Sequence, residues 1–307
     1  GQGSSGELQE RYFLQKVQLG QGSFGTVWRA IDRRSKDVVA IKQMEKARLR
    51  RRGLGHEYVE REVAMLRACP HTNIARLVDT FDDGGSVYLA LEYCDGGDLG
   101  DKVRERGLRI SEGEAAQWTW QMCAAIGALH SKRICHRDIK PDNFMVKTRA
   151  AGPTSVGVLK LSDFGMAVFL PPGKVLTEKC GTPAFMPPEV LLVPEKSRGY
   201  GLPADVWAAG VSIYMVMLGG RHPFLDDRGH LDNKLQLAGT LDFGRDPGEA
   251  GQRFPSDARR LCQCMVDRRP ERRMTSALAL RSPWLQRCVC AARGALPASP
   301  RQHARPP

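Results

Sequence analysis

The stretch His136-Arg137-Asp138-Ile139-Lys140-Pro141-Asp142-Asn143 decides how this chain is interpreted. It holds a carboxylate suited to act as a base, a lysine suited to neutralise a charged substrate, and an amide suited to bind a metal ion. Twenty residues after Asn143 comes Asp163-Phe164-Gly165, which adds a second carboxylate. Together the two stretches indicate chemistry on a charged substrate.

Two further motifs lie upstream. One is glycine-rich, Gly20-Gln21-Gly22-Ser23-Phe24-Gly25-Thr26-Val27, and the other ends in a lysine, Val39-Ala40-Ile41-Lys42. Glycines let a backbone approach phosphates closely. Alone, Gly-x-Gly-x-x-Gly is equally a dinucleotide-binding fingerprint, but that motif needs its third glycine to open a helix and an acidic residue about twenty positions later. Here Thr26-Val27-Trp28 is typical of a strand, and a strand lysine follows, which favours a phosphate loop of another kind.

These four motifs, in this order and at these spacings, match the signature set of protein kinases. From about Tyr12 to Leu285 the chain resembles a eukaryotic protein kinase. The resemblance implies an α+β, bilobal protein kinase fold, with a small β-rich N-lobe over residues 12–93 and a larger helical C-lobe over 94–285. It also implies serine/threonine specificity, because Lys140 stands two residues after Asp138, where tyrosine kinases usually differ.

The resemblance assigns the nucleotide site, with ATP as the phosphate donor. Lys42 is expected to hold the α- and β-phosphates, and Glu62, in Glu62-Val63-Ala64-Met65-Leu66, is expected to pair with it from a helix. The other expected nucleotide-binding positions are Leu19, Gly20, Gln21, Gly22, Ser23, Phe24, Gly25, Val27, Ala40, Leu91, Glu92, Cys94, Asp98 and Met145.

The resemblance also assigns the catalytic groups. Asp138 is expected to orient the substrate hydroxyl as the base, with Lys140 beside it. Asn143 and Asp163 are the expected Mg²⁺ ligands, because their hard oxygens suit a hard cation. Leu66, Leu77, His136 and Phe164 match the hydrophobic spine between the lobes, although simple core packing explains them equally well.

The segment from Asp163 to Glu189 matches the activation segment. It ends in Pro187-Pro188-Glu189, where the family usually has Ala-Pro-Glu. This departure puts local backbone geometry in question, not catalysis. The resemblance predicts that Glu189 pairs with Arg273, and that Thr182 helps to place Lys140 and Asp138.

Many kinases carry an activating phosphothreonine at the position that matches Glu178. A fixed carboxylate there would pair with Arg137 much as a phosphate does, with less charge. We therefore hypothesise activity without phosphorylation of the loop. Thr177 beside it is an alternative phosphorylation site, although exposed loop threonines are common.

Group-level features are similar to those of the calmodulin- and calcium-dependent kinases, and Gly173-Lys174-Val175 resembles calcium-dependent protein kinases in particular. Asp98 and Asp142 match places that contact an upstream arginine of the substrate, whereas the third such place holds Met215. The chain contains no Asp-x-Asp-x-Asp-Gly loop and no calmodulin-type helix after Leu285. Calcium control, if any, is therefore expected outside this chain.

Composition narrows the class of protein. The 307 residues suffice for two lobes with a sizeable core, and no apolar run approaches the roughly 18 residues of a membrane-spanning helix. The nine cysteines include no Cys-x-x-Cys pair, which favours reduced thiols and a cytoplasmic location. Acylation at Cys288-Val289-Cys290 is the weaker alternative.

The net charge of +12 can favour nucleic acid, an anionic membrane or acidic partners. The densest basic run, Lys46-Ala47-Arg48-Leu49-Arg50-Arg51-Arg52, is interpreted as a solvated surface loop, with a docking patch as the alternative. No basic run is interleaved with aromatic residues, so no nucleic-acid partner is expected. The expected partners are proteins with Ser or Thr acceptors, phosphorylated by a monomeric catalytic domain.

The two ends of the chain look different from the rest. Residues 1–6 are flexible by composition, so residues 1–11 are assigned to a flexible segment, and residues 286–307 to a disordered tail. If Gly1 follows a removed Met, the start fits the myristoylation pattern with Ser5 in place, which would give membrane association; a cloning remnant is the alternative.

Local patterns predict several elements between these ends. Helical spacing covers residues 56–68, and Val87-Tyr88-Leu89-Ala90-Leu91 has the character of a short buried strand. Ser111 and Glu114 have capping-box spacing and should start a helix that runs to about His130.

Two other classes of protein compete with an active protein kinase. A pseudokinase scaffold would lack Lys42, Asp138 or Asp163, and all three are present. A small-molecule kinase of related fold would not need the complete segment from Asp163 to Glu189. Both alternatives are therefore less favoured.

Overall fold

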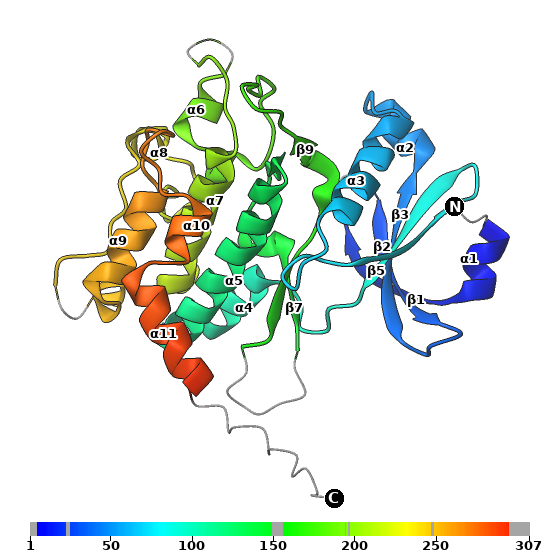
Figure 1. Cartoon of the computed structure of the whole chain (residues 1–307), viewed down its shortest axis with the longest axis horizontal. Coiled ribbons are helices and arrows are strands. Elements are labelled where there is room, and N and C mark those ends of the chain that lie inside the picture. The colour runs from blue at the N-terminus through cyan, green and yellow to red at the C-terminus, as the bar shows by residue number, and fades with distance from the viewer. Residues whose placement is uncertain are drawn as a thin grey trace, which may run out of the picture.

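The structure is a computed structural model that describes residues 5–22, 25–148, 156–193, 195, 197–246 and 249–294. It has two parts, a β-sheet with few helices and a larger helical part, joined after β5 (Figure 1). This is the bilobal α+β fold that the sequence predicts. The predicted change of lobe at residues 93–94 lies just beyond β5, which ends at Glu92.

The smaller part is a five-stranded antiparallel sheet in the order β1-β2-β3-β5-β4. Its strands are β1 (Tyr12–Gln21), β2 (Thr26–Asp32), β3 (Val38–Glu45), β4 (Leu77–Asp82) and β5 (Ser86–Glu92). Lys42 lies opposite Val27 on one side and Leu89 on the other, so its strand is central. The glycine-rich segment is the turn between β1 and β2. A Cβ at Gly25 would overlap the backbone carbonyl of Gln43, so only glycine fits there.

The helix α3 (His56–Ala68) covers one face of this sheet, and it matches the predicted residues. Its buried residues include Val59, Glu62, Val63 and Leu66, at helical spacing. The basic run at Lys46 differs from the expected loop: residues Lys46–Arg51 form α2, because Leu49 is buried against the core and anchors the turn.

The larger part is built around α5 (Glu112–Ser131) and α7 (Pro203–Met217). The capping box predicted at Ser111 and Glu114 is present, and α5 ends one residue after His130. Nearly every residue of α7 is buried, which places it at the centre of the helical core. The surrounding helices are α4 (Leu99–Arg106), α6 (Pro188–Leu191), α8 (Asn233–Ala238), α9 (Ser256–Met265), α10 (Ser276–Ala279) and α11 (Pro283–Gly294).

Two short pairs of antiparallel strands lie where the two parts meet. β7 (Phe144–Lys147) pairs with β8 (Val158–Leu161), and β6 (Ile134–Cys135) pairs with β9 (Val168–Phe169). They bracket the motifs at Asp138 and Asp163. Two members of the predicted spine, His136 and Phe164, are in contact here, with their ring centroids 5.0 Å apart.

The predicted terminal segments need correction. Residues Ser5–Arg11 form α1 rather than a flexible segment, because Leu8 is buried in the cluster that contains Tyr12 and Phe81. Residues 286–294 continue α11, so the predicted tail begins too early: Leu285 is fully buried and holds the helix on the core. The expectations for Gly1, for the side chains of Ser5 and Cys290, and for residues 295–307 lie outside what the structure describes.

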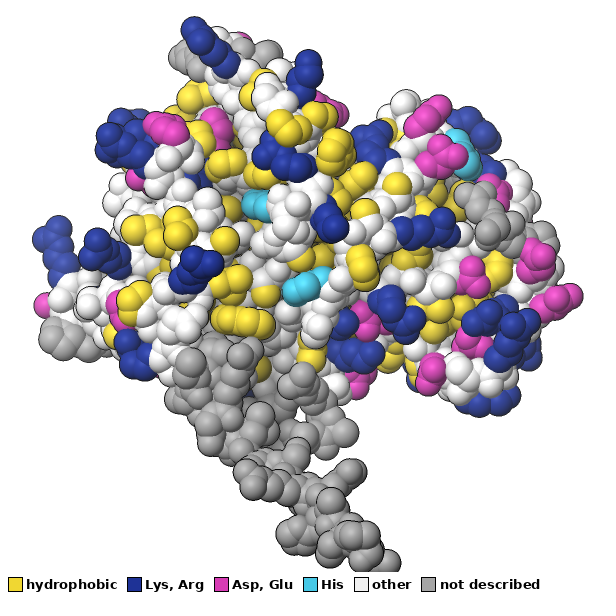
Figure 2. Space-filling model, viewed as in Figure 1, with side chains coloured by type: hydrophobic (Ala, Val, Ile, Leu, Met, Phe, Trp, Pro, Cys, Tyr) yellow, Lys and Arg dark blue, Asp and Glu magenta, His cyan; other side chains and the backbone are white. Residues whose placement is uncertain are grey.

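None of the described helices is both long and apolar enough to cross a bilayer. On the face shown in Figure 2, Lys and Arg side chains are spread over both lobes among Asp and Glu side chains. The positive charge is therefore not gathered into a single stripe on that face.

Candidate active site

A cleft of about 530 Å³ lies between the two lobes. Its floor and walls come from the glycine turn, β3, the segment after β5, β7 and the Asp163 turn. Of the predicted nucleotide-binding residues, the cleft brings together Leu19, Gly20, Gln21, Gly22, Gly25, Val27, Ala40, Lys42, Leu91, Glu92, Cys94, Asp98 and Met145. The other two, Ser23 and Phe24, lie outside the described residues.

Three charged side chains converge at the inner end of the cleft. Lys42 Nζ lies 2.7 Å from Glu62 Oε1 and 2.9 Å from Asp163 Oδ1. Burial by itself would lower the pKa of Lys42, but the two carboxylates raise it above its ordinary value, so the amine stays charged. Burial raises the pKa of Glu62 against the pull of Lys42. The predicted pair between β3 and α3 is thus formed.

The carboxylate of Asp163 is ionised, and about half of its side-chain surface is exposed to solvent. The positive charge of Lys42 lowers the pKa of Asp163 to about 2, and its side chain is 46% exposed toward the cleft. Its backbone is left-handed, with φ of 57°. Phe164, which follows, is fully buried against His136. This turn therefore buries the phenylalanine while it turns the carboxylate outward.

A tyrosine that the sequence analysis missed covers the same turn. A Cβ at Gly165 would overlap the hydroxyl oxygen of Tyr58, which comes from α3. Burial, followed by the nearby charge of Glu62, raises the pKa of Tyr58, so the phenol stays neutral. Tyr58 therefore packs α3 onto Gly165, and any larger residue there would have to displace the Tyr58 hydroxyl. The helical spacing of residues 56–68 marked Tyr58 only as part of a helix.

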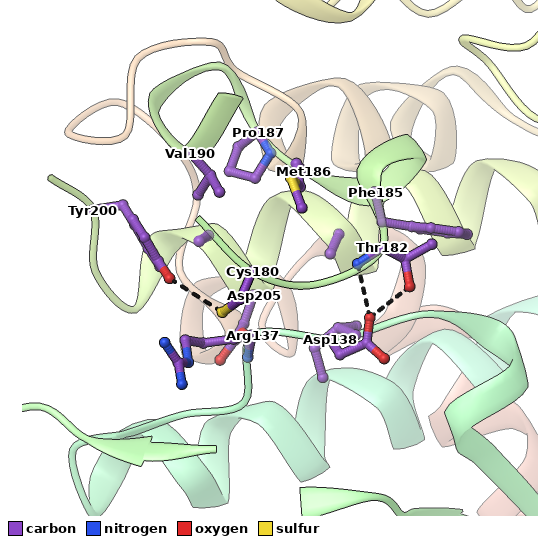
Figure 3. A pocket seen from close by; sticks show the side chains of 13 residues that line it. Arg137, Asp138, Cys180, Thr182, Phe185, Met186, Pro187, Val190, Tyr200 and Asp205 are labelled. Carbon is purple, nitrogen blue, oxygen red and sulfur yellow. Dashed lines mark hydrogen bonds between the residues drawn. The ribbon is translucent and has the colours of Figure 1, made fainter. Parts of the chain in front are cut away.

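The second catalytic cluster surrounds Asp138. Thr182 donates to Asp138 Oδ1 from its hydroxyl at 2.7 Å and from its backbone N–H at 3.0 Å. Lys140 Nζ lies 2.9 Å from Asp138 Oδ2 and 2.8 Å from the Thr182 hydroxyl. Asn143 Nδ2 donates to Oδ2 at 3.0 Å. The predicted contacts of Thr182 with Lys140 and Asp138 are confirmed, and Figure 3 shows those with Asp138.

These donors set the charge of Asp138. Burial would raise the pKa of Asp138, but the hydrogen bonds from Thr182, Lys140 and Asn143 hold it below its ordinary value. The carboxylate is therefore ionised at neutral pH and can accept a hydrogen bond from a hydroxyl group.

Asp205, on α7, fixes the backbone of the catalytic loop. Its carboxylate accepts from the backbone N–H of His136 and of Arg137, each at 2.9 Å, and lies 3.0 Å from His130 Nε2. The side chain is 1% exposed. Sequence analysis gave Asp205 no role. The available signal was a carboxylate in an otherwise apolar helix, which must find buried partners.

Arg137 connects this loop to the activation segment. Its Nη1 donates to Glu178 Oε2 at 3.0 Å and its Nε donates to the Met166 carbonyl at 2.6 Å. The predicted contact between Glu178 and Arg137 is confirmed. Near it, Cys180 Sγ lies 3.6 Å from the hydroxyl of Tyr200, and Figure 3 shows the two side chains facing each other.

The end of the activation segment is held from two sides. Arg273 forms two bonds with Glu189, Nη1 to Oε1 at 2.7 Å and Nη2 to Oε2 at 3.0 Å, as predicted. Gln236, a fully buried amide of α8, donates to the carbonyls of Pro183 and Met186, both at 2.9 Å. Gln236 was missed, because an amide in a short helix carries no sequence signal of its partners.

The acids predicted to meet an upstream arginine lie close together. A Cβ at Gly100 would come within 3.1 Å of Asp98 Oδ1 and 3.3 Å of Asp142 Cγ. Arg104 already approaches this group: its Nη2 lies 2.6 Å from Asp101 and its Nη1 lies 4.0 Å from Asp142. Burial and neighbouring carboxylates raise the pKa of Asp98. The group is thus an incompletely neutralised acidic surface beside the cleft.

Comparison with known proteins agrees with the fold. Residues 13–285 match the sequence model of the protein kinase domain, and the chain belongs to this family.

Within the family the chain is similar to calcium-dependent protein kinases. It is 35% identical to calcium-dependent protein kinase 10 of Arabidopsis thaliana over 281 residues, which is 91% of this chain and 49% of that protein. It is 36% identical to calcium-dependent protein kinase 20 of Oryza sativa subsp. japonica over 270 residues, 88% of this chain and 46% of that protein. The chain thus spans about half the length of these curated relatives.

Proposed function

We propose that this chain transfers the γ-phosphoryl group of ATP to serine or threonine hydroxyls of protein substrates. The observation that carries the proposal is the convergence, on one cleft, of the Lys42–Glu62–Asp163 cluster and the Asp138–Lys140–Asn143 cluster. Phosphoryl transfer needs positioning and charge neutralisation more than covalent help from the protein. The complete segment up to Glu189 favours a protein substrate over a small molecule.

The residues present fit Mg²⁺ bound together with a nucleotide. Asp163 is ionised, and Asn143 uses its Nδ2 toward the backbone carbonyl of Asp138, at 2.7 Å, which leaves Oδ1 for a cation. The described residues contain no group of three or more His, Cys, Asp or Glu side chains able to hold a metal. Two protein ligands are what Mg²⁺ needs when phosphate oxygens and water complete its shell. When bound, the ion would neutralise phosphate charge.

The chain's own residues supply the remaining functions. Asp138 accepts a hydrogen bond from the substrate hydroxyl and orients its oxygen toward the phosphate. Because its pKa is low, Asp138 takes up the proton only late in the transfer. Lys140, held between Asp138 and Thr182, stabilises the charge on the transferred group. Lys42, kept charged by Glu62, binds the other phosphates.

We further propose that the domain is active without phosphorylation of its activation segment. Glu178 already neutralises Arg137, whose side chain is only 6% exposed, whereas Glu178 itself is 74% exposed. The pair therefore orders the activation segment with a carboxylate that is part of the chain, whereas a phosphate group would have to be added by a kinase. Expected substrates carry an arginine three residues before the acceptor, because Asp98 and Asp142 form an acidic surface next to the cleft.

Three further points complete the proposal. The eight cysteines that the structure describes are all free, which supports a reducing, cytoplasmic environment for a monomeric domain. Acylation of Gly1 would add membrane attachment. Calcium control, suggested by the sequence resemblance and by the names of the relatives, would be exerted by segments other than those described here.

The test is magnesium-dependent transfer from ATP to an Arg-x-x-Ser peptide and to its Ala-x-x-Ser partner, with calcium chelated. We expect transfer that favours the arginine peptide, and a loss of at least about 100-fold in Asp163→Ala. ATP binding without transfer in the wild-type protein would contradict the proposal and indicate a scaffold.

A second experiment tests independence from loop phosphorylation. Protein treated with a phosphatase, and shown by mass spectrometry to be unphosphorylated, should keep its activity. Glu178→Ala should lose most of it, because Arg137 is left without that carboxylate, whereas Glu10→Ala, an exposed carboxylate on α1, should not. Unchanged activity in Glu178→Ala would refute this part of the proposal.

A further inference from the structure

A second cavity, of about 490 Å³, lies behind the nucleotide cleft. It is formed by the end of α3, the connection from α3 to β4, and β8. Leu66, Ala75 and Glu92 line both cavities, so they form the wall between them. No role assigned above to nucleotide, metal or substrate uses the far side of this wall.

The cavity is rich in positive charge. Arg67, Arg76 and Lys160 line it, together with His71. The single acidic side chain on its wall is Glu92, which is already compensated twice.

The contacts of Glu92 account for that compensation. One carboxylate oxygen lies 2.7 Å from Lys160 Nζ and 2.9 Å from the Arg76 backbone N–H, and the other lies 3.2 Å from Lys147 Nζ. Glu92 is only 7% exposed, so its orientation is fixed. The negative charge of Glu92 is therefore already neutralised by Lys160 and Lys147, and it does not neutralise the arginines of the cavity.

The two arginines keep their charge unpaired within the described part of the chain. No described carboxylate lies within ion-pair distance of Arg67 or Arg76. Arg67 makes only a long side-chain hydrogen bond among the described residues, 3.4 Å from its Nη2 to the hydroxyl of Thr80. Both arginines line the cavity and are exposed to solvent. Guanidinium groups in this state bind carboxylates, sulfonates and phosphates through paired N–H donors.

Part of the cavity lining is apolar and lies beside the charged groups. Leu66, Ile74 and Leu77 contribute side chains to its lining, and Ile74 is fully buried. The volume falls within the range of about 300–1,000 Å³ that is typical of small-molecule sites. An apolar body with one anionic group would therefore satisfy both parts of the lining, whereas a bare inorganic anion would leave the apolar wall uncovered.

We propose that this cavity is a second ligand site, which binds a small organic anion with an apolar body, its acidic group held by Arg67 and Arg76. The proposal does not depend on phosphotransfer. It concerns binding on the opposite side of the Leu66–Ala75–Glu92 wall from the nucleotide.

A matched pair of fluorescent probes tests it. One is 8-anilinonaphthalene-1-sulfonate; the other is N-phenyl-1-naphthylamine, which has the same rings without the sulfonate. Binding is measured with the cleft saturated by magnesium and ADP. We expect the sulfonate probe to bind at one equivalent, at least tenfold more tightly than the neutral probe, and to weaken as salt rises.

The variants locate the site. Arg67→Gln/Arg76→Gln should weaken the sulfonate probe at least tenfold and leave the neutral probe within twofold. The control Arg50→Gln/Arg51→Gln removes the same charge from exposed positions on α2 and should change neither. Thermal melts confirm that each variant is folded.

Three results would overturn the proposal: equal affinity of the sulfonate probe for the wild type and the Arg67→Gln/Arg76→Gln variant, equal affinity of the two probes for the wild type, or displacement of the sulfonate probe by ADP. The second and third use the wild-type protein alone, so they decide the matter even if a variant does not fold.

Discussion

Replacing Glu189 with alanine should destabilise the domain through its buried partner. Arg273 has a fully buried side chain that forms two bonds with Glu189. Removing one partner of a buried pair costs about 3–5 kcal/mol, because a charge stays buried without its counter-ion. Arg273 would keep its bonds to the carbonyls of Pro203 and Asp267, both at 2.9 Å, and its contact with the Trp207 ring. We therefore expect the lower end, about 3 kcal/mol.

Equilibrium unfolding in urea measures this change. At about 2 °C per kcal/mol for a chain of this size, the melting temperature should fall by about 6 °C. Arg273→Met removes the charge instead, and the double variant should be less destabilised than the sum of the single changes by about 2 kcal/mol or more. A loss under about 1 kcal/mol, or additive effects, would refute the reasoning that the buried charge carries the cost.

Three other predictions concern the catalytic loop and the response to pH. Thr182→Val removes a hydroxyl that lowers the pKa of Asp138, so the acidic limb of kcat/KM should move to higher pH; an unmoved limb would contradict the contact. Burial lowers the pKa of His222 to about 4, below its unfolded value, so its contribution to stability is complete above about pH 6.5 and falls by up to about 3 kcal/mol as the pH drops to 4. His222→Asn should flatten that slope in unfolding curves recorded across this range, and an unchanged slope would assign the effect to another group. Asp205→Asn places an amide N–H₂ group against the backbone N–H of His136 or Arg137, so one hydrogen bond is lost. The free energy of unfolding should fall by about 2 kcal/mol, and kcat should fall with it. Wild-type values of both quantities would show that the charge of Asp205 is dispensable.

The sequence by itself determined the family, the two-lobed fold and the residues of the cleft. Motifs such as Gly20-x-Gly22-x-x-Gly25 and Asp163-Phe164-Gly165 span only a few consecutive residues, so they and their order can be identified from the sequence without a structure. The capping box at Ser111 and the helix over residues 56–68 are local for the same reason. The Glu189–Arg273 and Glu178–Arg137 contacts were foreseen only through resemblance to relatives.

Only the tertiary structure decided the rest. The buried carboxylate of Asp205 meets a backbone 69 residues away, and Tyr58 meets Gly165 through the packing of α3 on the Asp163 turn. Burial of Leu8 turned an expected flexible segment into a helix, since tertiary packing outweighs local composition. The cavity behind the cleft likewise exists only because α3, β4 and β8 meet there. Residues that lie so far apart in the sequence and meet in the fold produce no periodic pattern or characteristic spacing in the sequence. The packing of whole helices and strands sets the geometry that brings them together.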